Sequence, residues 1–195
     1  ASTSAGAAGA ADEEVTALGH HLAWWHGQGW RVAICPRHPE RGGDIAALVE
    51  RLDGVPRRTS RGDMLTGLVN EVLVVDEIGR LAALYAWTAA TAGIAVVGGS
   101  LGSGRRGQNM LEAAAAGCCT VVGWDTRNFP DAMALLREAG GVDEIAIDGD
   151  LTRLMSLAGD ATRRATLGAR AQAAWRAGQG AVERTMRRVR AACAP

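Results

Sequence analysis

The stretch that decides the fold is Ile94-Ala-Val-Val-Gly-Gly-Ser-Leu-Gly-Ser-Gly-Arg-Arg-Gly-Gln-Asn-Met-Leu-Glu112. Four apolar residues are followed by a glycine-rich loop and then by a helical pattern, which together predict one strand–turn–helix unit. Glycines let the backbone approach a ligand closely, and the start of a helix offers free N–H groups to an anion. No Gly-Lys-Ser/Thr follows, so this is not a Walker loop. The stretch predicts a ligand-binding turn at the carboxyl end of a buried strand.

Similar units lie on both sides of this stretch. Short buried strands are expected at 31–36, 72–75, 94–98, 120–123 and 144–147. Helices are expected at 12–26, 43–53, 79–90, 108–116, 130–139, 150–158, 160–176 and 181–192, with Asp150 and Asp160 as N-caps. The strands are apolar on both faces, as in a sheet covered by helices on each side, and βα alternation predicts a doubly wound, Rossmann-like parallel α/β sheet. A strand would normally precede the first helix, and Ala1–Ser4 could be its carboxyl end.

Length and charge narrow the class of protein. The chain has 195 residues, a mass of 20.2 kDa and equal numbers of basic and acidic residues, 21 each, with every basic residue an arginine. This length suits one domain at 1–195, with a βα core at 1–150 and C-terminal helices at 151–195. Charge balance argues against nucleic acid as a partner. No apolar run approaches the roughly 18 residues that span a bilayer, and the N-terminus lacks the basic region of a signal peptide.

The cysteines give no sign of a disulfide framework or a metal site. Cys35 lies in an apolar strand, and the adjacent Cys118 and Cys119 should point to opposite faces of another. Zinc sites use paired cysteines with histidines at ligand spacing, which are missing here. Buried free thiols are the expected state, and no metal is expected.

A rigid loop follows the strand at 31–36. Two prolines enclose Arg37 and His38, so the loop cannot continue as a helix. A guanidinium held at a strand end suits a phosphate or a carboxylate, which it can bind through two donors. The alternative is a solvated loop in which Arg37 pairs with Glu40 or Asp44.

Two further strand ends carry candidate binding groups. Asn109 and Glu112 are one turn apart, so both can face the same crevice, where a carboxylate is better suited to sugar hydroxyls than to phosphate. The alternative there is a flexible glycine loop with a capping Asn. At 76–79, backbone groups of Ile78 and Gly79 could read a base, whereas the simpler expectation is helix capping by Asp76 or Glu77.

Taken in order, these segments resemble the C-terminal domain of the bacterial 3-deoxy-D-manno-octulosonic acid (Kdo) transferases. The motifs that carry the resemblance are Ala1-Ser-Thr3, Pro36-Arg-His-Pro-Glu-Arg41, Arg57-Arg-Thr-Ser-Arg-Gly62, Asp76-Glu-Ile-Gly79, Tyr85, Val97-Gly-Gly-Ser-Leu101, Gly107-Gln-Asn109, Glu112-Ala-Ala114, Gly117 and Asn128-Phe129. They cover roughly residues 1 to 140. The 36–41 motif and the 97–112 motif together are specific for this family, whereas either motif alone is not.

The resemblance implies the donor-binding domain of a GT-B glycosyltransferase, with CMP-Kdo as the donor and no metal or other cofactor. The residues that it implies for donor binding are Ser2, Thr3, Arg37, His38, Ile78, Gly79, Gly98, Gly99, Ser100, Gly107, Asn109 and Glu112. Arg37 and the helix start near Asn109 would stabilise the departing phosphate. The hydroxyls of Ser2, Thr3 and Ser100 would donate to the phosphate or to the Kdo carboxylate. Glu112 would accept hydrogen bonds from the ribose hydroxyls.

The resemblance also implies an N-terminal domain outside this sequence, which would bind the lipid A precursor and carry the general base of an inverting reaction. The chain is therefore expected to be a fragment that is inactive alone, to have an exposed sheet edge and to associate. The full-length protein would act in lipopolysaccharide biosynthesis, as a peripheral protein on the cytoplasmic face of the inner membrane.

Two alternatives stay open beside this reading, and departures from the family pattern at Ser4, Arg106 and Pro130, with a further one at Ala113, motivate the second of them. One is a GT-B domain for another nucleotide sugar, such as a UDP-sugar. The other is a non-catalytic nucleotide-binding domain.

Overall fold

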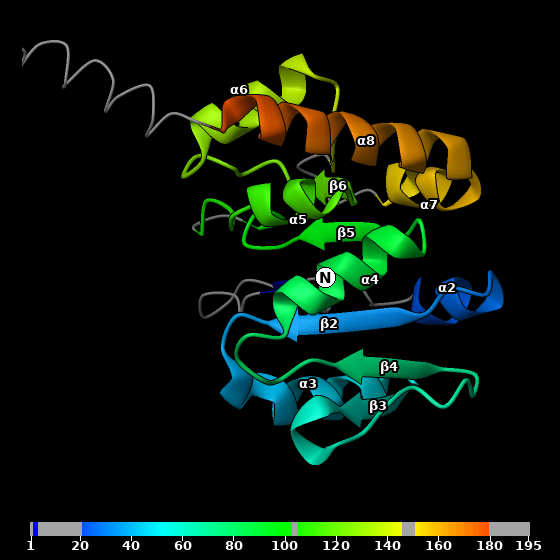
Figure 1. The fold of residues 1–195 in the computed structure, drawn as a ribbon. Coiled ribbons are helices and arrows are strands. Elements are labelled where there is room, and N and C mark those ends of the chain that lie inside the picture. Colours follow the sequence, from blue (N-terminus) through cyan, green and yellow to red (C-terminus); the bar gives the residue numbers. More distant parts are fainter. Residues whose placement is uncertain (1, 4–20, 103–104, 146–150, 180–195) are drawn as a thin grey trace, which may run out of the picture.

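Seven strands form one sheet with the order β3-β4-β2-β1-β5-β6-β7 (Figure 1). The computed structural model describes residues 2–3, 21–102, 105–145 and 151–179. The strands are β1 (Ser2–Thr3), β2 (Val32–Pro36), β3 (Val55–Arg58), β4 (Glu71–Val74), β5 (Ile94–Val97), β6 (Cys119–Val122) and β7 (Val142–Glu144). All six neighbouring pairs are parallel. The predicted doubly wound parallel sheet is confirmed.

Helices cover both faces of this sheet. They are α2 (Leu22–Gly27), α3 (Gly42–Arg51), α4 (Leu81–Ala90), α5 (Leu111–Ala116), α6 (Pro130–Glu138), α7 (Thr152–Gly159) and α8 (Ala161–Gly178), with short 3-10 turns at Pro39–Arg41 and Thr59–Arg61. One core cluster joins β5 and β6 to α4, α5, α6 and α8, and a second joins them to α2, α7 and α8. A third packs α2 and α3 on β2 and β4. No helix in the described ranges is both long and apolar enough to cross a membrane.

Several predicted details of the core are confirmed. Cys118 and Cys119 are buried in different clusters, so they do lie on opposite faces, and Cys35 is a third buried free thiol. Asp160 caps α8 by accepting from the backbone N–H of Arg163 at 2.8 Å. The predicted cap Asp150, the helix at 181–192 and Cys193 lie outside the described residues, as does most of the helix expected at 12–26.

One strand of the sheet was not predicted, and the bounds of another differ from the prediction. The strand that was not predicted is β3, which pairs with β4 from Val55 to Arg58 at the edge of the sheet. Proline and exposed charge are features of edge strands, which is why the run Val-Pro-Arg-Arg has no buried-strand pattern. The strand expected at 144–147 begins earlier, at Val142, because Gly140 and Gly141 end α6 and let the chain turn at once into β7.

The strand order creates a switch point beside β1. On one side of β1 lie β2, β4 and β3, which the chain forms first, and the chain then crosses to form β5, β6 and β7 on the other side. The switch point therefore lies between the carboxyl ends of β1 and β5, where a doubly wound sheet has a crevice. Ligands of doubly wound proteins bind at such a crevice.

Candidate functional site

Four of the predicted segments meet at the carboxyl edge of the sheet. In β1, Thr3 pairs with Pro36 of β2, and Ser2 pairs with both Cys35 of β2 and Val97 of β5. Arg37 and Gly98 therefore leave strands that flank β1, and the segment 76–79 leaves β4, the next neighbour of β2. Adjacent strands lie about 4.8 Å apart, so the ends of β2 and β5 are separated by roughly 10 Å, a span that one nucleotide phosphate group can bridge with side chains on either side.

Arg37 is exposed at this edge. Within the described part of the chain, no carboxylate lies at ion-pair distance from its guanidinium, so the alternative pairing with Glu40 or Asp44 is not formed. Glu40 lies instead beside His38, with 3.5 Å between the carboxylate and Nδ1. The guanidinium is therefore available to an anion.

The glycine-rich loop after β5 closes on itself. The N–H of Gly107 donates to the carbonyl of Gly99 at 2.7 Å, and the N–H of Gln108 donates to the carbonyl of Gly98 at 3.0 Å. Gly99 has a φ of 74°, and a Cβ there would lie 3.1 Å from Gln108. Glycine is therefore required at 99 for the loop to return to the start of α5.

Ser100 has a different role from the predicted one. Its hydroxyl donates to the carbonyl of Val97 at 2.7 Å and accepts from the N–H of Gly123 at 2.8 Å, and the residue is buried. A hydroxyl has one proton, and this one is already donated within the protein. The prediction that the Ser100 hydroxyl donates to a phosphate or carboxylate is therefore wrong, because the hydroxyl joins the ends of β5 and β6.

Asn109 and Glu112 lie together at the start of α5, as predicted. The Asn109 amide donates to a Glu112 carboxylate oxygen at 3.1 Å, and its own oxygen accepts from the N–H of Leu111 at 3.1 Å. Both side chains are exposed. The hydrogen bond orients the carboxylate and leaves its second oxygen open to solvent.

Asn128 supports the glycine loop from the neighbouring connection, a role that the sequence analysis missed. Its side-chain amide donates to the carbonyl of Arg105 at 3.1 Å, and its backbone N–H donates to the carbonyl of Arg106 at 3.0 Å. Arg106 is held in the left-handed region with a φ of 61°, a backbone conformation that favours glycine. Phe129 packs against the first core cluster.

The segment after β4 presents Ile78 and Gly79 to solvent. Ile78 is 91% exposed, and Gly79 has a φ of 85° that favours glycine. α4 begins at Leu81 without a side-chain cap, so the predicted capping by Asp76 or Glu77 is wrong.

Asp76 instead holds the segment that follows β3. Its buried carboxylate accepts from the Ser60 N–H at 2.9 Å, the Ser60 hydroxyl at 2.8 Å and the Arg58 guanidinium at 2.7 Å. Burial alone would raise the pKa of Asp76, but the hydrogen bonds from Ser60 and Arg58 outweigh burial and hold this pKa below its usual value. A Cβ on Gly42 would lie 2.2 Å from the carboxylate, so Asp76 also fixes the start of α3.

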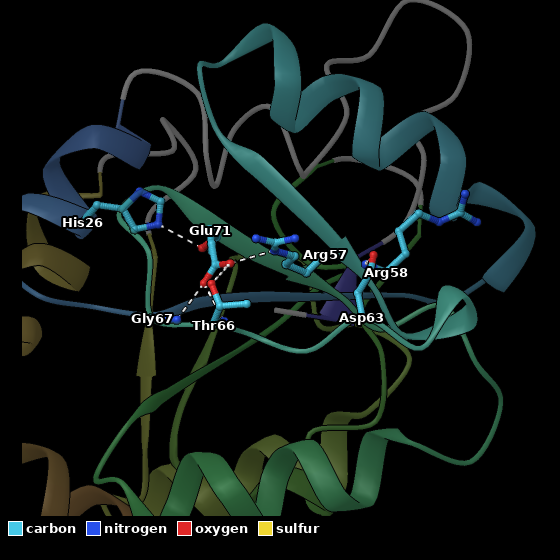
Figure 2. A network of polar contacts seen from close by, with 7 residues as sticks. All are labelled: His26, Arg57, Arg58, Asp63, Thr66, Gly67 and Glu71. Carbon is cyan, nitrogen blue, oxygen red and sulfur yellow. Dashed lines mark hydrogen bonds and ion pairs between the residues drawn. The ribbon is translucent and has the colours of Figure 1, made fainter.

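A second buried carboxylate occupies the opposite end of β4 (Figure 2). Glu71 accepts from Arg57 at 2.7 Å, from the Thr66 N–H and hydroxyl at 2.8 Å each, and from the Gly67 N–H at 2.9 Å. Burial opposes ionisation, but these donors lower the pKa of Glu71 to about 2. His26 lies on the other side, with Nε2 3.2 Å from the Glu71 carbonyl. This network is far from the carboxyl edge and has a structural role.

The remaining predicted residues are placed by backbone alone. Ser2 and Thr3 form β1 between β2 and β5, so their backbone lies at the switch point, and Gly98, Gly99 and Gly107 are buried in the closed loop. Among the described residues, no three His, Cys, Asp or Glu side chains gather as metal ligands would.

Known proteins resemble this chain in sequence. No family model matches it. It is 36% identical over 108 residues to the "Probable 3-deoxy-D-manno-octulosonic acid transferase, mitochondrial" of Arabidopsis thaliana, covering 55% of this chain and 23% of that protein. It is 33% identical over 160 residues to the 3-deoxy-D-manno-octulosonic acid transferase of Bordetella pertussis, covering 80% of this chain and 35% of the relative. The chain thus spans about a third or less of the length of these relatives.

A solved structure has the same fold. The C-terminal CMP-Kdo binding domain of WaaA from Acinetobacter baumannii superimposes with a TM-score of 0.73 at 24% identity, over 89% of this chain and 86% of that one. The resemblance stated on the motifs is confirmed, as is the predicted fold class.

Proposed function

We propose that this chain, whose sequence and fold identify it as a homologue of the C-terminal domain of the Kdo transferases, binds CMP-Kdo at the carboxyl edge of its sheet. The observation that carries the proposal is the position of Arg37. It is an exposed guanidinium without a carboxylate partner among the described residues, and it leaves β2 next to the switch point between β1 and β5. A cation held there without an internal partner suits an anionic ligand.

The roles of the other groups follow from their placement. Arg37 binds the phosphate of the donor, assisted by backbone N–H groups near Asn109, and His38 lies at the rim of the same loop. The exposed carboxylate of Glu112, oriented by Asn109, accepts hydroxyl protons of the ribose. Exposed backbone at Ile78 and Gly79 reads the base, and Ser2 and Thr3, whose backbone lies at the switch point, are proposed as contacts of the phosphate or the Kdo carboxylate.

In the whole protein this domain serves a transfer reaction. The bond between the anomeric carbon of Kdo and the phosphate oxygen breaks, and CMP leaves with the electron pair. Arg37 stabilises the charge that develops on the departing phosphate, which is the task that a metal ion performs in other transferases. We propose a metal-independent, inverting reaction in which a general base outside this chain removes the proton of the acceptor hydroxyl.

The acceptor and the location are part of the same proposal. A Kdo transferase of lipopolysaccharide biosynthesis transfers Kdo to a lipid A precursor, which a second domain would bind. The full-length protein would then be a peripheral protein on the cytoplasmic face of the inner membrane.

Calorimetric titration of the chain with CMP, UMP and UDP tests the donor class. CMP should bind more tightly than UMP and UDP. Arg37→Ala should weaken CMP binding by about 10- to 100-fold, the loss expected for charge-assisted hydrogen bonds. The matched control is Arg51→Ala, since Arg51 is an exposed arginine at the C-terminal end of α3, away from the carboxyl edge. The Arg51→Ala variant should bind CMP as tightly as the unchanged chain.

The other outcomes point to the alternatives. Tighter binding of UDP than of CMP would indicate a GT-B domain for a UDP-sugar. No detectable nucleotide binding by the folded chain would contradict the proposal and favour a domain that has lost catalysis.

A further inference from the structure

Arg106 has a backbone conformation that arginine rarely adopts. Its φ of 61° lies in the left-handed region, where the Cβ of an L-residue crowds the neighbouring carbonyl oxygen. Gly99 and Gly107 of the same loop have similar φ values, 74° and 88°, but glycine has no Cβ to be crowded. Strained residues persist where the surrounding structure enforces them, and they gather at ligand sites. A strained arginine beside the candidate site therefore indicates a role for its side chain.

Hydrogen bonds fix the backbone around Arg106 from two sides. The Arg106 carbonyl accepts from the Asn128 N–H at 3.0 Å, and the Asn128 side-chain amide donates to the carbonyl of Arg105 at 3.1 Å. The next residue, Gly107, donates to the carbonyl of Gly99, so the loop closes directly beyond β5. Figure 1 shows this loop on the same side of the sheet as the turn from β2 into α3. The Arg106 side chain therefore starts from a fixed position at the carboxyl edge.

The carboxyl edge holds positive charge in two separate places. Arg37 follows β2, whereas Arg105 and Arg106 follow β5; all three are exposed, and no described carboxylate lies at ion-pair distance from them. The exposed carboxylate of Glu112 is hydrogen-bonded to Asn109 rather than to an arginine of the loop. Three other acidic side chains at this edge already have arginine partners, in the pairs Asp76–Arg58, Glu77–Arg80 and Asp125–Arg127. The edge thus offers one cationic position on each side of β1.

A donor with two separate anionic groups matches two separate cationic positions. Kdo is a 2-keto acid, so in CMP-Kdo the anomeric carbon of the sugar carries both the bond to the phosphate and a carboxylate. The ends of β2 and β5 lie roughly 10 Å apart, and arginines that approach from these two ends can each bind one of the two groups. A guanidinium suits a carboxylate as well as a phosphate, because it binds either through two parallel donors.

We propose that Arg106 binds the carboxylate of the donor sugar and thereby selects nucleotide-linked keto-acid sugars over nucleotide sugars that lack a carboxylate. The inference rests on the proposed function and deepens it, since Arg37 keeps the phosphate and Arg106 reads the sugar. Arg106 adds nothing to the binding of the nucleotide alone. Its strained backbone lowers stability in exchange for this specificity, so a glycine at 106 should give a more stable but less selective protein.

Calorimetric titrations with two ligands test the inference. One ligand is freshly prepared CMP-Kdo, and the other is the methyl ester of CMP, which has the same phosphodiester charge but no carboxylate. Arg106→Gly removes the guanidinium and the backbone strain together, so weaker binding by this variant cannot come from unfolding. Arg106→Lys keeps the charge but loses the paired donors. The matched control is Arg61→Gln, because Arg61 is an exposed arginine that follows β3, with β4, β2 and β1 between it and β5.

Arg106→Gly should weaken CMP-Kdo binding by about tenfold or more and change binding of the methyl ester by less than about twofold. Arg106→Lys should lose less CMP-Kdo affinity than Arg106→Gly, and Arg61→Gln should bind both ligands as the unchanged chain does.

Two results would overturn the inference while the proposed function stands. The first is an equal loss for both ligands in Arg106→Gly, which would assign the guanidinium to the phosphate. The second is unchanged binding of both ligands by that variant. If the folded, unchanged chain bound neither ligand, the inference and the proposed function would both be wrong.

Discussion

Replacing Asp76 with asparagine removes the charge that holds the segment after β3 at the carboxyl edge. One oxygen of Asp76 accepts from the Ser60 N–H at 2.9 Å and from Thr59 Oγ1 at 3.3 Å. The other accepts from the Ser60 hydroxyl and from Arg58. An asparagine NH₂ must occupy one of these positions, and there it faces N–H donors with a donor of its own.

The better placement of the asparagine directs its NH₂ at the Ser60 N–H and keeps its oxygen on Arg58. It leaves a buried donor without an acceptor, which costs about 1–3 kcal/mol, and weakens a charge-assisted hydrogen bond worth about 1.5–3 kcal/mol. We expect Asp76→Asn to lower the free energy of unfolding by about 3 kcal/mol, somewhat less than the 3–5 kcal/mol that is typical when one partner of a buried ion pair is removed.

Urea unfolding near pH 7 measures this loss, and hydrogen exchange should locate it at residues 58–62. The matched control is Asp63→Asn, which affects one hydrogen bond, from the Arg58 N–H at 2.9 Å, and should lose only about 1 kcal/mol. Because the folded-state pKa of Asp76 is lowered, its contribution is complete above about pH 4 and is lost as the pH falls through the folded-state pKa. An Asp76→Asn loss no larger than that of Asp63→Asn would refute this reasoning.

Three further predictions concern the loops around the sheet. The folded-state pKa of Glu71 is about 2, so the unchanged chain should lose stability as the pH falls from about 4.3. Glu71→Gln should make the urea midpoint depend less on pH in this range, and an unchanged pH profile would contradict the assigned network. Arg106→Gly should raise the free energy of unfolding by about 0.5–1 kcal/mol, because the strain relieved at this left-handed backbone position outweighs the entropy that glycine adds to the unfolded chain. A variant that unfolds at a lower urea concentration would show that the Arg106 side chain contributes more to stability than its backbone strain costs. Ser100→Ala should cost about 1–3 kcal/mol by leaving the Gly123 N–H unpaired while CMP affinity of the folded protein stays unchanged, and a selective loss of CMP affinity would restore Ser100 as a ligand contact.

The fold could be predicted because buried strands and helices have local patterns. β5 is uniformly apolar, β6 is apolar except for Thr120, and both lie between glycines and helices, so their neighbours in the sequence reveal them. β3 could not be predicted in this way, because Val55-Pro-Arg-Arg58 becomes a strand only through its register with β4 at the sheet edge.

The candidate site was predictable in position but less so in the role of each side chain. Strand ends place Arg37 and the glycine loop at one edge, and this follows from topology alone. The partners of Asp76 lie 16 to 18 residues away in the sequence, and Gly123, whose N–H donates to the Ser100 hydroxyl, lies 23 residues away. Contacts at that distance leave no periodic signal in the sequence, so local capping and ligand binding were the roles that the sequence favoured for these two residues.

Amide chemical shifts of the ¹⁵N-labelled chain, followed during titration with CMP, test most directly whether the donor binds at the switch point. Perturbed resonances should belong to residues 37–38, 78–79 and 98–112, with the rest of the sheet unaffected. Perturbations confined to the opposite edge, around Trp30 and residues 66–71, or saturating binding without any change at 37–38 and 98–112, would contradict the account.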